Sequence, residues 1–159
     1  VRFLDDDNNP VLDEFNNEVI ATFDAVDVHV GDAAQTQYGI SLRYEPTFNT
    51  YFKIRGTYFD NYYSDFDPLS LNGVNARRES WKIPSYALFD LHCGYKIKLS
   101  KKNKLNLRFS ILNLLNEMYI SDAQNNDPYN ANYQDFDAKS AGVYFGLGRR
   151  INLSATFNF

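Results

Sequence analysis

Apolar and polar residues alternate through much of this chain, and the alternation is strictest near its end. Between residues 143 and 159 one parity is apolar and the other is polar, charged or glycine. The apolar parity comprises Val143, Phe145, Leu147, Ile151, Leu153, Ala155, Phe157 and Phe159. Only Arg149 interrupts it. Because successive side chains of a strand point to opposite faces, this period predicts one β-strand with an apolar face over 143–159.

The same period recurs earlier in the chain. It runs through Tyr86–Leu99, Lys104–Ile111, Tyr38–Tyr44 and Phe52–Tyr58. The alternation slips over 112–115, and this slip predicts a β-bulge. No sequence repeat other than this alternation is visible. The chain is therefore predicted to be all-β and antiparallel.

A weaker pattern and a turn complete the expected elements. Val19 to Val30 is predicted to form another strand, with Asp24 and Asp27 as interruptions. Pro46 lies in the segment 45–49, which is predicted to be a turn.

The predicted connections alternate in length. Those over 45–49 and 100–103 are short, whereas those over 65–85 and 121–142 are long and polar. Barrels of bacterial outer membranes have short periplasmic turns and long extracellular loops, while a soluble β-sandwich has no reason to sort its loops in this way. The pattern therefore favours a transmembrane β-barrel.

Composition excludes several other classes. No window approaches about 18 consecutive apolar residues, so a transmembrane helix is excluded. The net charge of -4, without a run of Lys or Arg, argues against a nucleic-acid partner. One cysteine, Cys93, cannot form an internal disulfide framework. Aromatic residues make up 16% of the chain, a bias typical of strands and of surfaces that meet lipid headgroups.

The apolar parity could face either a protein core or lipid. Segments of ten or more residues favour lipid, because soluble strands usually have five or six. Tyr44, Tyr51 and Phe52 are then expected in the periplasmic aromatic girdle. The outer girdle is expected to draw on Tyr62, Tyr63, Trp81, Tyr86 and Tyr119. The basic residues on the other parity would face a wide lumen.

The expected architecture is the last five or six strands of a larger barrel. Even a small closed barrel needs about eight strands, and an open sheet in lipid leaves unpaired edges. The opening segment 1–7 has neither an initiator Met nor a signal peptide, so the chain is expected to be cut from a longer one. Residues 1–159 are thus interpreted as the C-terminal part of one barrel domain.

Four segments resemble TonB-dependent outer-membrane receptors from about residue 32 onward. They are Leu42-Arg43-Tyr44-Glu45-Pro46, Gly56-Thr57-Tyr58-Phe59-Asp60-Asn61-Tyr62-Tyr63, Phe89-Asp90-Leu91-His92-Cys93-Gly94-Tyr95, and Leu112-Asn113-Leu114-Leu115-Asn116-Glu117-Met118-Tyr119-Ile120. Leu115 stands where an aromatic residue is common in this family.

The resemblance implies a barrel of about 22 strands with an N-terminal plug. The TonB energy-transducing complex would act through an N-terminal region that these residues do not include. Such receptors import scarce ligands, including iron chelates, cobalamin, glycans and peptides. The implied location is the bacterial outer membrane, among its lipid and lipopolysaccharide.

The C-terminal residues resemble the assembly signal of outer-membrane barrels. Phe159 and Phe157 are the last and antepenultimate residues, and Asn152 is polar, whereas Ser154 stands where a Gly is frequent. This resemblance implies recognition by the barrel-assembly machinery.

Loop aromatics are the candidate ligand-binding residues, because exposed aromatic side chains often mark recognition surfaces. They are Tyr62, Tyr63, Trp81, Tyr129 and Tyr133, with girdle or loop packing as the competing role. The carboxylates of 5–7 and 60–67 do not have calcium-loop spacing. His29 and His92 have no accompanying nucleophile motif. No catalytic site, metal site or cofactor is predicted.

Two other functions stay open from the residues alone. A passive porin or adhesin barrel would share the strand pattern without needing a plug. A soluble, secreted, carbohydrate-binding β-sandwich would bury the apolar parity in its own core.

Overall fold

The computed structural model of the chain describes residues 2–125 and 137–159. Within these residues it has nine strands and two 3-10 turns. The strands are β1 (Thr36–Thr47), β2 (Thr50–Asp60), β3 (Tyr62–Tyr63), β4 (Lys82–Ile83), β5 (Tyr86–Lys98), β6 (Lys104–Leu112), β7 (Ile120–Asn125), β8 (Ala141–Phe145) and β9 (Arg150–Asn158). The 3-10 turns are η1 (Pro68–Ser70) and η2 (Gly73–Asn75). The all-β, antiparallel prediction is confirmed.

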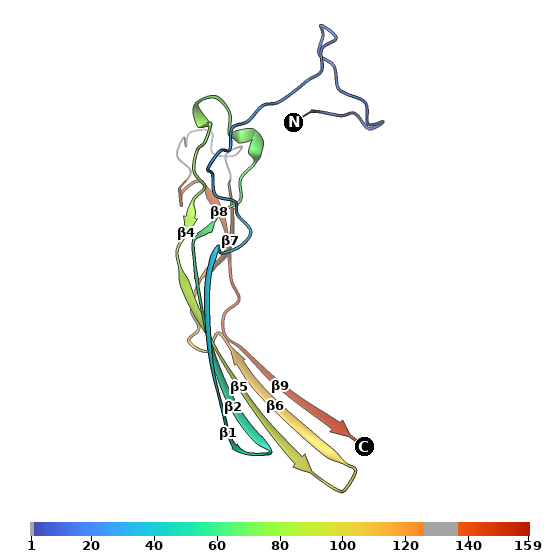
Figure 1. Cartoon of the computed structure of the whole chain (residues 1–159), viewed down its shortest axis with the longest axis vertical. Helices are drawn as coiled ribbons and strands as arrows, with labels where there is room; N and C mark the ends of the chain where they lie inside the picture. Colours follow the sequence, from blue (N-terminus) through green and yellow to red (C-terminus); the bar gives the residue numbers. More distant parts are fainter. Residues whose placement is uncertain (1, 126–136) are drawn as a thin grey trace.

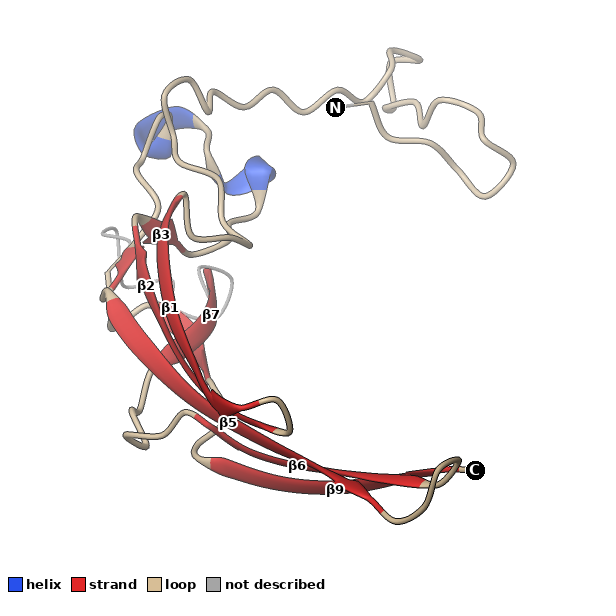
Figure 2. Ribbon diagram, turned by 60° about the horizontal axis from the view of Figure 1, so that its bottom comes forward, coloured by secondary structure: helices blue, strands red, loops and turns tan. Residues whose placement is uncertain are grey.

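Five long strands form one antiparallel sheet in the order β1-β2-β5-β6-β9. Each strand pairs with the next long strand along the chain, so the sheet is a meander with β1 and β9 as free edges. Figure 2 shows this sheet as a curved wall. Both short turns lie at one end of the sheet, and the long connections lie at the other (Figure 1).

Two small ladders extend this sheet at the long-connection end. Strand β3 pairs with β4, and β7 pairs with β8. The backbone N–H of Asp65 donates to the carbonyl of Ala123 at 2.8 Å and joins the two ladders. The connections predicted over 65–85 and 121–142 are therefore partly strand, because β4, β7 and the start of β8 lie within them. No helix among the described residues is long and apolar enough to cross a membrane.

Asparagines in the left-handed region end two of the long strands. Asn61 follows β2 with a φ of 50°, and Asn113 follows β6 with a φ of 52°. Asparagine tolerates this conformation better than most residues. The β-bulge predicted over 112–115 is therefore wrong, since β6 ends at Leu112 and a turn follows.

The single strand predicted over 143–159 is in fact two strands. It is interrupted over 146–149, where Gly146 N–H donates to the Tyr119 carbonyl and Arg149 N–H donates to Asn116 Oδ1 at 2.9 Å. Strand β8 thus pairs with β7, and β9 pairs with β6. The one break in the sequence pattern, Arg149, lies within the interruption.

The turn predicted over 45–49 is tighter than expected. Thr47 pairs with Thr50, so only Phe48 and Asn49 lie between β1 and β2. The ladder shifts register between Tyr44 and Thr47. This irregularity on an edge strand accommodates Pro46, which cannot donate a ladder hydrogen bond.

The strand predicted from Val19 to Val30 does not form. Asp24 Oδ1 accepts the N–H of Val26 at 3.1 Å, and Asp27 has a φ of 63°. Asp24 N–H also donates to the carbonyl of Leu71 at 2.9 Å. The backbone of this segment is therefore used in a turn and in holding the loop around η1.

An eight-residue repeat shapes the N-terminal arm, residues 2–20. Asp5 Oδ1 accepts the N–H groups of the residues two and four positions later, at 3.0 and 2.8 Å. Asp13 makes the same pair of contacts at 2.9 and 2.8 Å. Asn8 and Asn16 are left-handed at matching positions. The expectation of no repeat beyond strand alternation is therefore wrong, and these carboxylates cap turns of the arm.

Candidate functional site

Register places the apolar residues of the five strands on one face in continuous rows. One row is Leu42, Ile54, Leu91, Ile111 and Ile151. The next row is Tyr44, Phe52, Cys93, Phe109 and Leu153. These residues stay exposed at the sheet edges, with 69% of Leu42 and 77% of Leu153 accessible. The sheet therefore presents one wide apolar surface.

Charged and hydrogen-bonding side chains occupy the opposite face. One row across it is Arg43, Lys53, His92, Ser110 and Asn152. Arg55 Nε lies 3.7 Å from Asp90 Oδ2, and Asp90 Oδ1 accepts the N–H of Asn113 at 3.0 Å. Asp90 thus anchors the end of β6 to β5. A depression of about 310 Å³ surrounds this pair and His92.

Two tyrosine rings lie over glycines: Tyr51 of β2 over Gly94 of β5, and Tyr119 over Gly146 in the break between β8 and β9. A Cβ atom added at Gly94 would lie 2.0 Å from Cε1 of Tyr51, and one added at Gly146 would lie 2.0 Å from Cζ of Tyr119. Only glycine permits so close an approach. Tyr51 shares a face with Lys53 rather than with Phe52, so its predicted place in the apolar girdle is wrong. Tyr86 pairs with Phe59 and lies on the polar parity of β5, so its predicted place in the outer girdle is also wrong. Its ring stacks on that of Tyr119, with the ring centroids 4.5 Å apart.

The predicted ligand-binding aromatics differ in accessibility. Tyr62 is only 7% exposed, packs with Ile83 and Ala123, and donates its hydroxyl to the Ser121 carbonyl at 2.7 Å. Burial raises the pKa of Tyr62 to about 12. Its ring is therefore not open to a ligand. Trp81 is half-buried against the same cluster.

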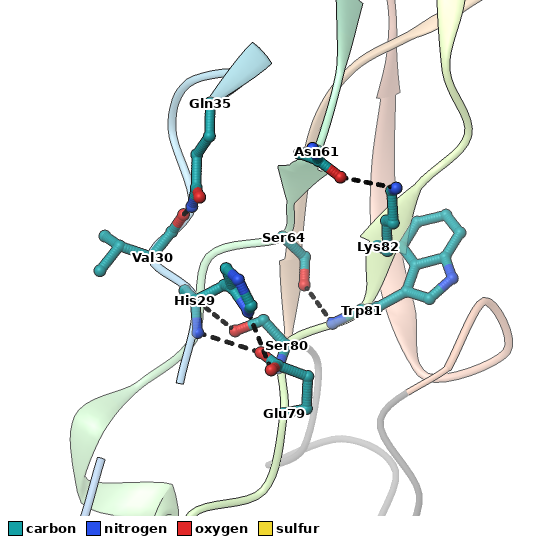
Figure 3. A network of polar contacts seen from close by, with 9 residues as sticks. All are labelled: His29, Val30, Gln35, Asn61, Ser64, Glu79, Ser80, Trp81 and Lys82. Carbon is teal, nitrogen blue, oxygen red and sulfur yellow. Dashed lines mark hydrogen bonds and ion pairs between the residues drawn. The ribbon is translucent and has the colours of Figure 1, made fainter. Parts of the chain in front are cut away.

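The contact between His29 and Glu79 holds the segment before β1 against the segment that leads into β4 (Figure 3). His29 Nδ1 lies 2.9 Å from Glu79 Oε2, and the His29 N–H donates to Glu79 Oε1 at 3.0 Å. The Tyr63 ring stacks on the His29 ring at 4.1 Å and 5°. Ser80 Oγ donates to the His29 carbonyl at 2.8 Å, not to the ring, so the arrangement is not a nucleophile and base pair.

Hydrogen bonds to the Glu79 carboxylate favour its ionised form. Partial burial opposes ionisation, but the hydrogen bonds from His29 and from the Ser80 N–H outweigh it and hold the pKa of Glu79 below its usual range. Nearby, Arg77 Nε donates to Asp24 Oδ2 at 2.6 Å, and this hydrogen bond lowers the pKa of Asp24. Together these pairs fasten the loops at this end of the sheet.

Tyr129 and Tyr133 lie outside the described residues. Of the predicted aromatic set, the structure therefore brings Tyr62, Tyr63 and Trp81 together around the β3–β4 ladder.

The proposed assembly-signal residues lie along β9 and at its end. Phe157 pairs with Leu105 on the apolar face, and Asn152 pairs with Ser110 on the polar face. Phe159 follows the strand and stacks on Phe157 with centroids 6.2 Å apart. All three residues are exposed, so they are accessible to another protein or to lipid.

No group of three or more His, Cys, Asp or Glu side chains in residues 2–125 and 137–159 is arranged to hold a metal ion. Comparison of the chain with known protein families, with curated proteins and with solved structures found no match.

Sequence reasoning missed two of these arrangements. The His29–Glu79 contact joins residues 50 positions apart, and no local pattern signals it. The contact of Tyr51 with Gly94 depends on the register of β2 with β5. A glycine within an alternating strand is the one available signal, because it often marks a close approach by another group.

Proposed function

We propose that this chain forms part of the wall of an outer-membrane β-barrel transporter of the TonB-dependent kind. The apolar face would meet lipid, and the polar face would line the interior. One observation carries this proposal: a five-strand apolar face that no second layer covers anywhere in the described part of the chain.

A soluble β-sandwich would need that second layer. Its inner faces would pack about 10 Å apart and bury the alternating apolar residues. Among the described residues, the buried hydrophobic side chains are Tyr62, Leu71, Ile83 and Ala123, and none of them belongs to the five-stranded sheet. Soluble monomers rarely expose apolar patches beyond a few hundred Å². Lipid is the partner that such a surface fits best.

Strand lengths support the same reading. Strands β9 and β5 have nine and 13 residues. At about 3.4 Å per residue and a tilt of about 40°, these lengths correspond to heights of roughly 23 and 34 Å. The apolar band of an outer-membrane barrel is about 25 Å tall.

Closure requires strands in addition to these. The free edges of β1 and β9 carry backbone groups that lipid cannot satisfy. Further strands of a longer chain, or less readily other subunits, would pair with them. The barrel-assembly machinery would recognise β9 through Phe157, Phe159 and Asn152.

Energised uptake of a scarce ligand rests on the resemblance of the four strand and turn segments to TonB-dependent receptors. An iron chelate, cobalamin, a glycan or a peptide is the proposed cargo, with the TonB complex acting through an N-terminal plug. A passive porin or adhesin barrel would share the two-faced sheet. A plug domain encoded in the same gene favours the receptor, and its absence favours the passive barrel.

The first test is the behaviour of the chain itself in water. Residues 1–159, expressed without a signal sequence, are expected to aggregate unless detergent and the completing strands are supplied. A soluble, cooperatively unfolding monomer in plain buffer would overturn the membrane proposal in favour of a secreted β-sandwich.

A further inference from the structure

A groove crosses the polar face of the sheet near the short turns. It has a volume of about 570 Å³ and is lined on this face by side chains of four strands. They are Arg43, Tyr51, Lys96, Lys104, Asn106 and Arg108. A volume of this size lies within the range of small-molecule sites.

Tyr51 and Arg43 pack together along this groove. The Tyr51 ring lies over Gly94, where a Cβ atom would clash with it. The guanidinium carbon of Arg43 lies 4.1 Å from the centroid of the same ring, a cation–π contact. Arg43 also pairs with Glu45. The stacked pair of Arg43 and Tyr51 therefore bounds the groove on one side.

Charge is segregated along the chain. The hairpins 36–60 and 86–112 and strand β9 carry ten of the 16 Lys and Arg residues but only three of the 20 Asp and Glu residues. Each of those three carboxylates already has a cation partner: Glu45 with Arg43, Asp60 with Lys82, and Asp90 with Arg55. The chain as a whole is nevertheless negative.

Three cations of the groove have no carboxylate partner within the described residues. They are Lys96, Lys104 and Arg108, and all three are exposed. Lys96 pairs with Asn106, and Lys104 and Arg108 lie two residues to either side of Asn106 on β6. With strands about 4.8 Å apart and alternate residues about 7 Å apart, Lys96 starts roughly 8 Å from each of the other two, which start roughly 14 Å from each other. An anion bound between these like charges would relieve their mutual repulsion.

We propose that this groove binds a multivalent oxyanion, a small molecule that carries several phosphate or carboxylate groups. Arg108 would supply a bidentate donor, and Lys96 and Lys104 would supply point charges. Tyr51 and Asn106 add neutral hydrogen-bonding groups at the floor and wall. The inference depends only on the polar face, so it holds whether the apolar face meets lipid or protein.

The test is calorimetric titration of the completed barrel that contains this sheet, in zwitterionic detergent, with tripolyphosphate, citrate and inorganic phosphate. The first two ligands separate phosphate from carboxylate chemistry, and the third controls for valence. Saturable binding of tripolyphosphate or citrate, at least tenfold tighter than that of inorganic phosphate, is expected. Failure of both multivalent anions to saturate a folded chain would overturn the proposal.

Matched variants locate the site. Lys96→Gln/Arg108→Gln removes two charges from the groove and is expected to weaken binding about tenfold or more, since each charge-assisted hydrogen bond contributes strongly. Lys101→Gln/Lys102→Gln removes the same charge from the adjacent turn, outside the groove, and is expected to weaken binding less than about threefold. Equal losses in the two variants would show diffuse attraction and overturn the proposal.

A second measurement needs no substitution. Tripolyphosphate is expected to protect Lys96 and Lys104 of the unaltered, completed barrel from an amine-reactive label, read by mass spectrometry, while Lys101 and Lys102 stay reactive. Equal protection of all four lysines would contradict a defined groove. Neither readout depends on membrane insertion, so failure here is distinguishable from failure of the proposed transport function.

Discussion

The Leu153→Arg substitution places a guanidinium in the middle of the surface assigned to lipid. Leu153 is 77% exposed and pairs with Phe109 in the row that also contains Cys93. Cys93 is the eighth of the 13 residues of β5, so this row lies near the middle of the sheet. A charge there would have to leave water when the wall enters a bilayer.

The expected cost is that of an arginine near the bilayer midplane, about 2 to 4 kcal/mol. A penalty of this size lowers the folding equilibrium constant by roughly 30-fold to 1,000-fold. The assay is urea-driven unfolding, from lipid vesicles, of the completed barrel that contains this sheet. Folded and unfolded forms are separated by the heat-dependent mobility of the barrel in a gel.

Thr156→Arg is the matched control, because it adds the same side chain to the polar face of the same strand. Thr156 pairs with the neutral Asn106, whereas Ser154 pairs with Arg108 and would add a like-charge contact. The control is expected to cost less than about 1 kcal/mol. Equal losses from the two substitutions would refute the assignment of the faces.

Three further predictions concern single contacts. Gly94→Ala pushes a Cβ atom into the Tyr51 ring and is expected to lower the free energy of unfolding, measured in urea, by about 1 to 3 kcal/mol. Gly39→Ala is the control, because a Cβ atom there has nothing within 4 Å, and it should be neutral or slightly stabilising. Equal effects of the two substitutions would contradict the close approach of Tyr51 to Gly94. The side chain of Asn113 is 5% exposed and makes three hydrogen bonds, two with the Glu117 backbone and one with the Leu147 carbonyl. Asn113→Ala removes all three and is expected to lower the free energy of unfolding by about 1 to 3 kcal/mol. A decrease below about 0.5 kcal/mol would contradict a stabilising role for these bonds. Because the pKa of Glu79 is lowered, its contact with His29 stabilises the fold above the ordinary carboxyl pKa, and this stabilisation is lost as pH falls through the lowered value. The fluorescence emission of Trp81, the one tryptophan, should therefore shift to the red on acidification, and Glu79→Gln should abolish that pH dependence. An unchanged pH dependence in the variant would exclude Glu79 as the cause.

Alternation was sufficient to predict four of the five long strands, but it did not separate β9 from β8. It predicted the ends of β5 and β6 to within a residue or two. A strand with one apolar face repeats every two residues, and no other periodic pattern is present in these segments. The same parity assigned the apolar and polar faces, and register then aligned them across the sheet. The presence of a strand, and the face on which each of its side chains lies, depend mainly on neighbouring residues, so a local sequence pattern predicts both.

Interruptions were harder to predict because they depend on partners distant in sequence. The break over 146–149 follows from contacts with Tyr119 and Asn116, about thirty residues away. The segment Val19 to Val30 reads as a strand by hydropathy, but Asp24 is held by Leu71 and Arg77. Pairing of this kind cannot be read from periodicity alone.

Aromatic side chains were misplaced for a related reason. Tyrosine was expected in a girdle, as at a membrane interface, yet the Tyr51 ring covers Gly94 on the neighbouring strand β5, and the Tyr119 ring covers Gly146 in the break between β8 and β9. An aromatic ring over a cross-strand glycine compensates for the missing side chain. Which role a tyrosine takes depends on the residue that register puts opposite it.

The most direct test of the central claim uses the only cysteine of the chain, Cys93, which lies on the apolar face beside Phe52 and Phe109. A small fluorophore on Cys93, in the completed barrel reconstituted into vesicles, is expected to be quenched by brominated lipids and not by aqueous iodide. In the Cys93→Ser background, the same label on His92→Cys should give the reverse pattern. Iodide quenching at Cys93 without lipid quenching would contradict a lipid-facing apolar surface.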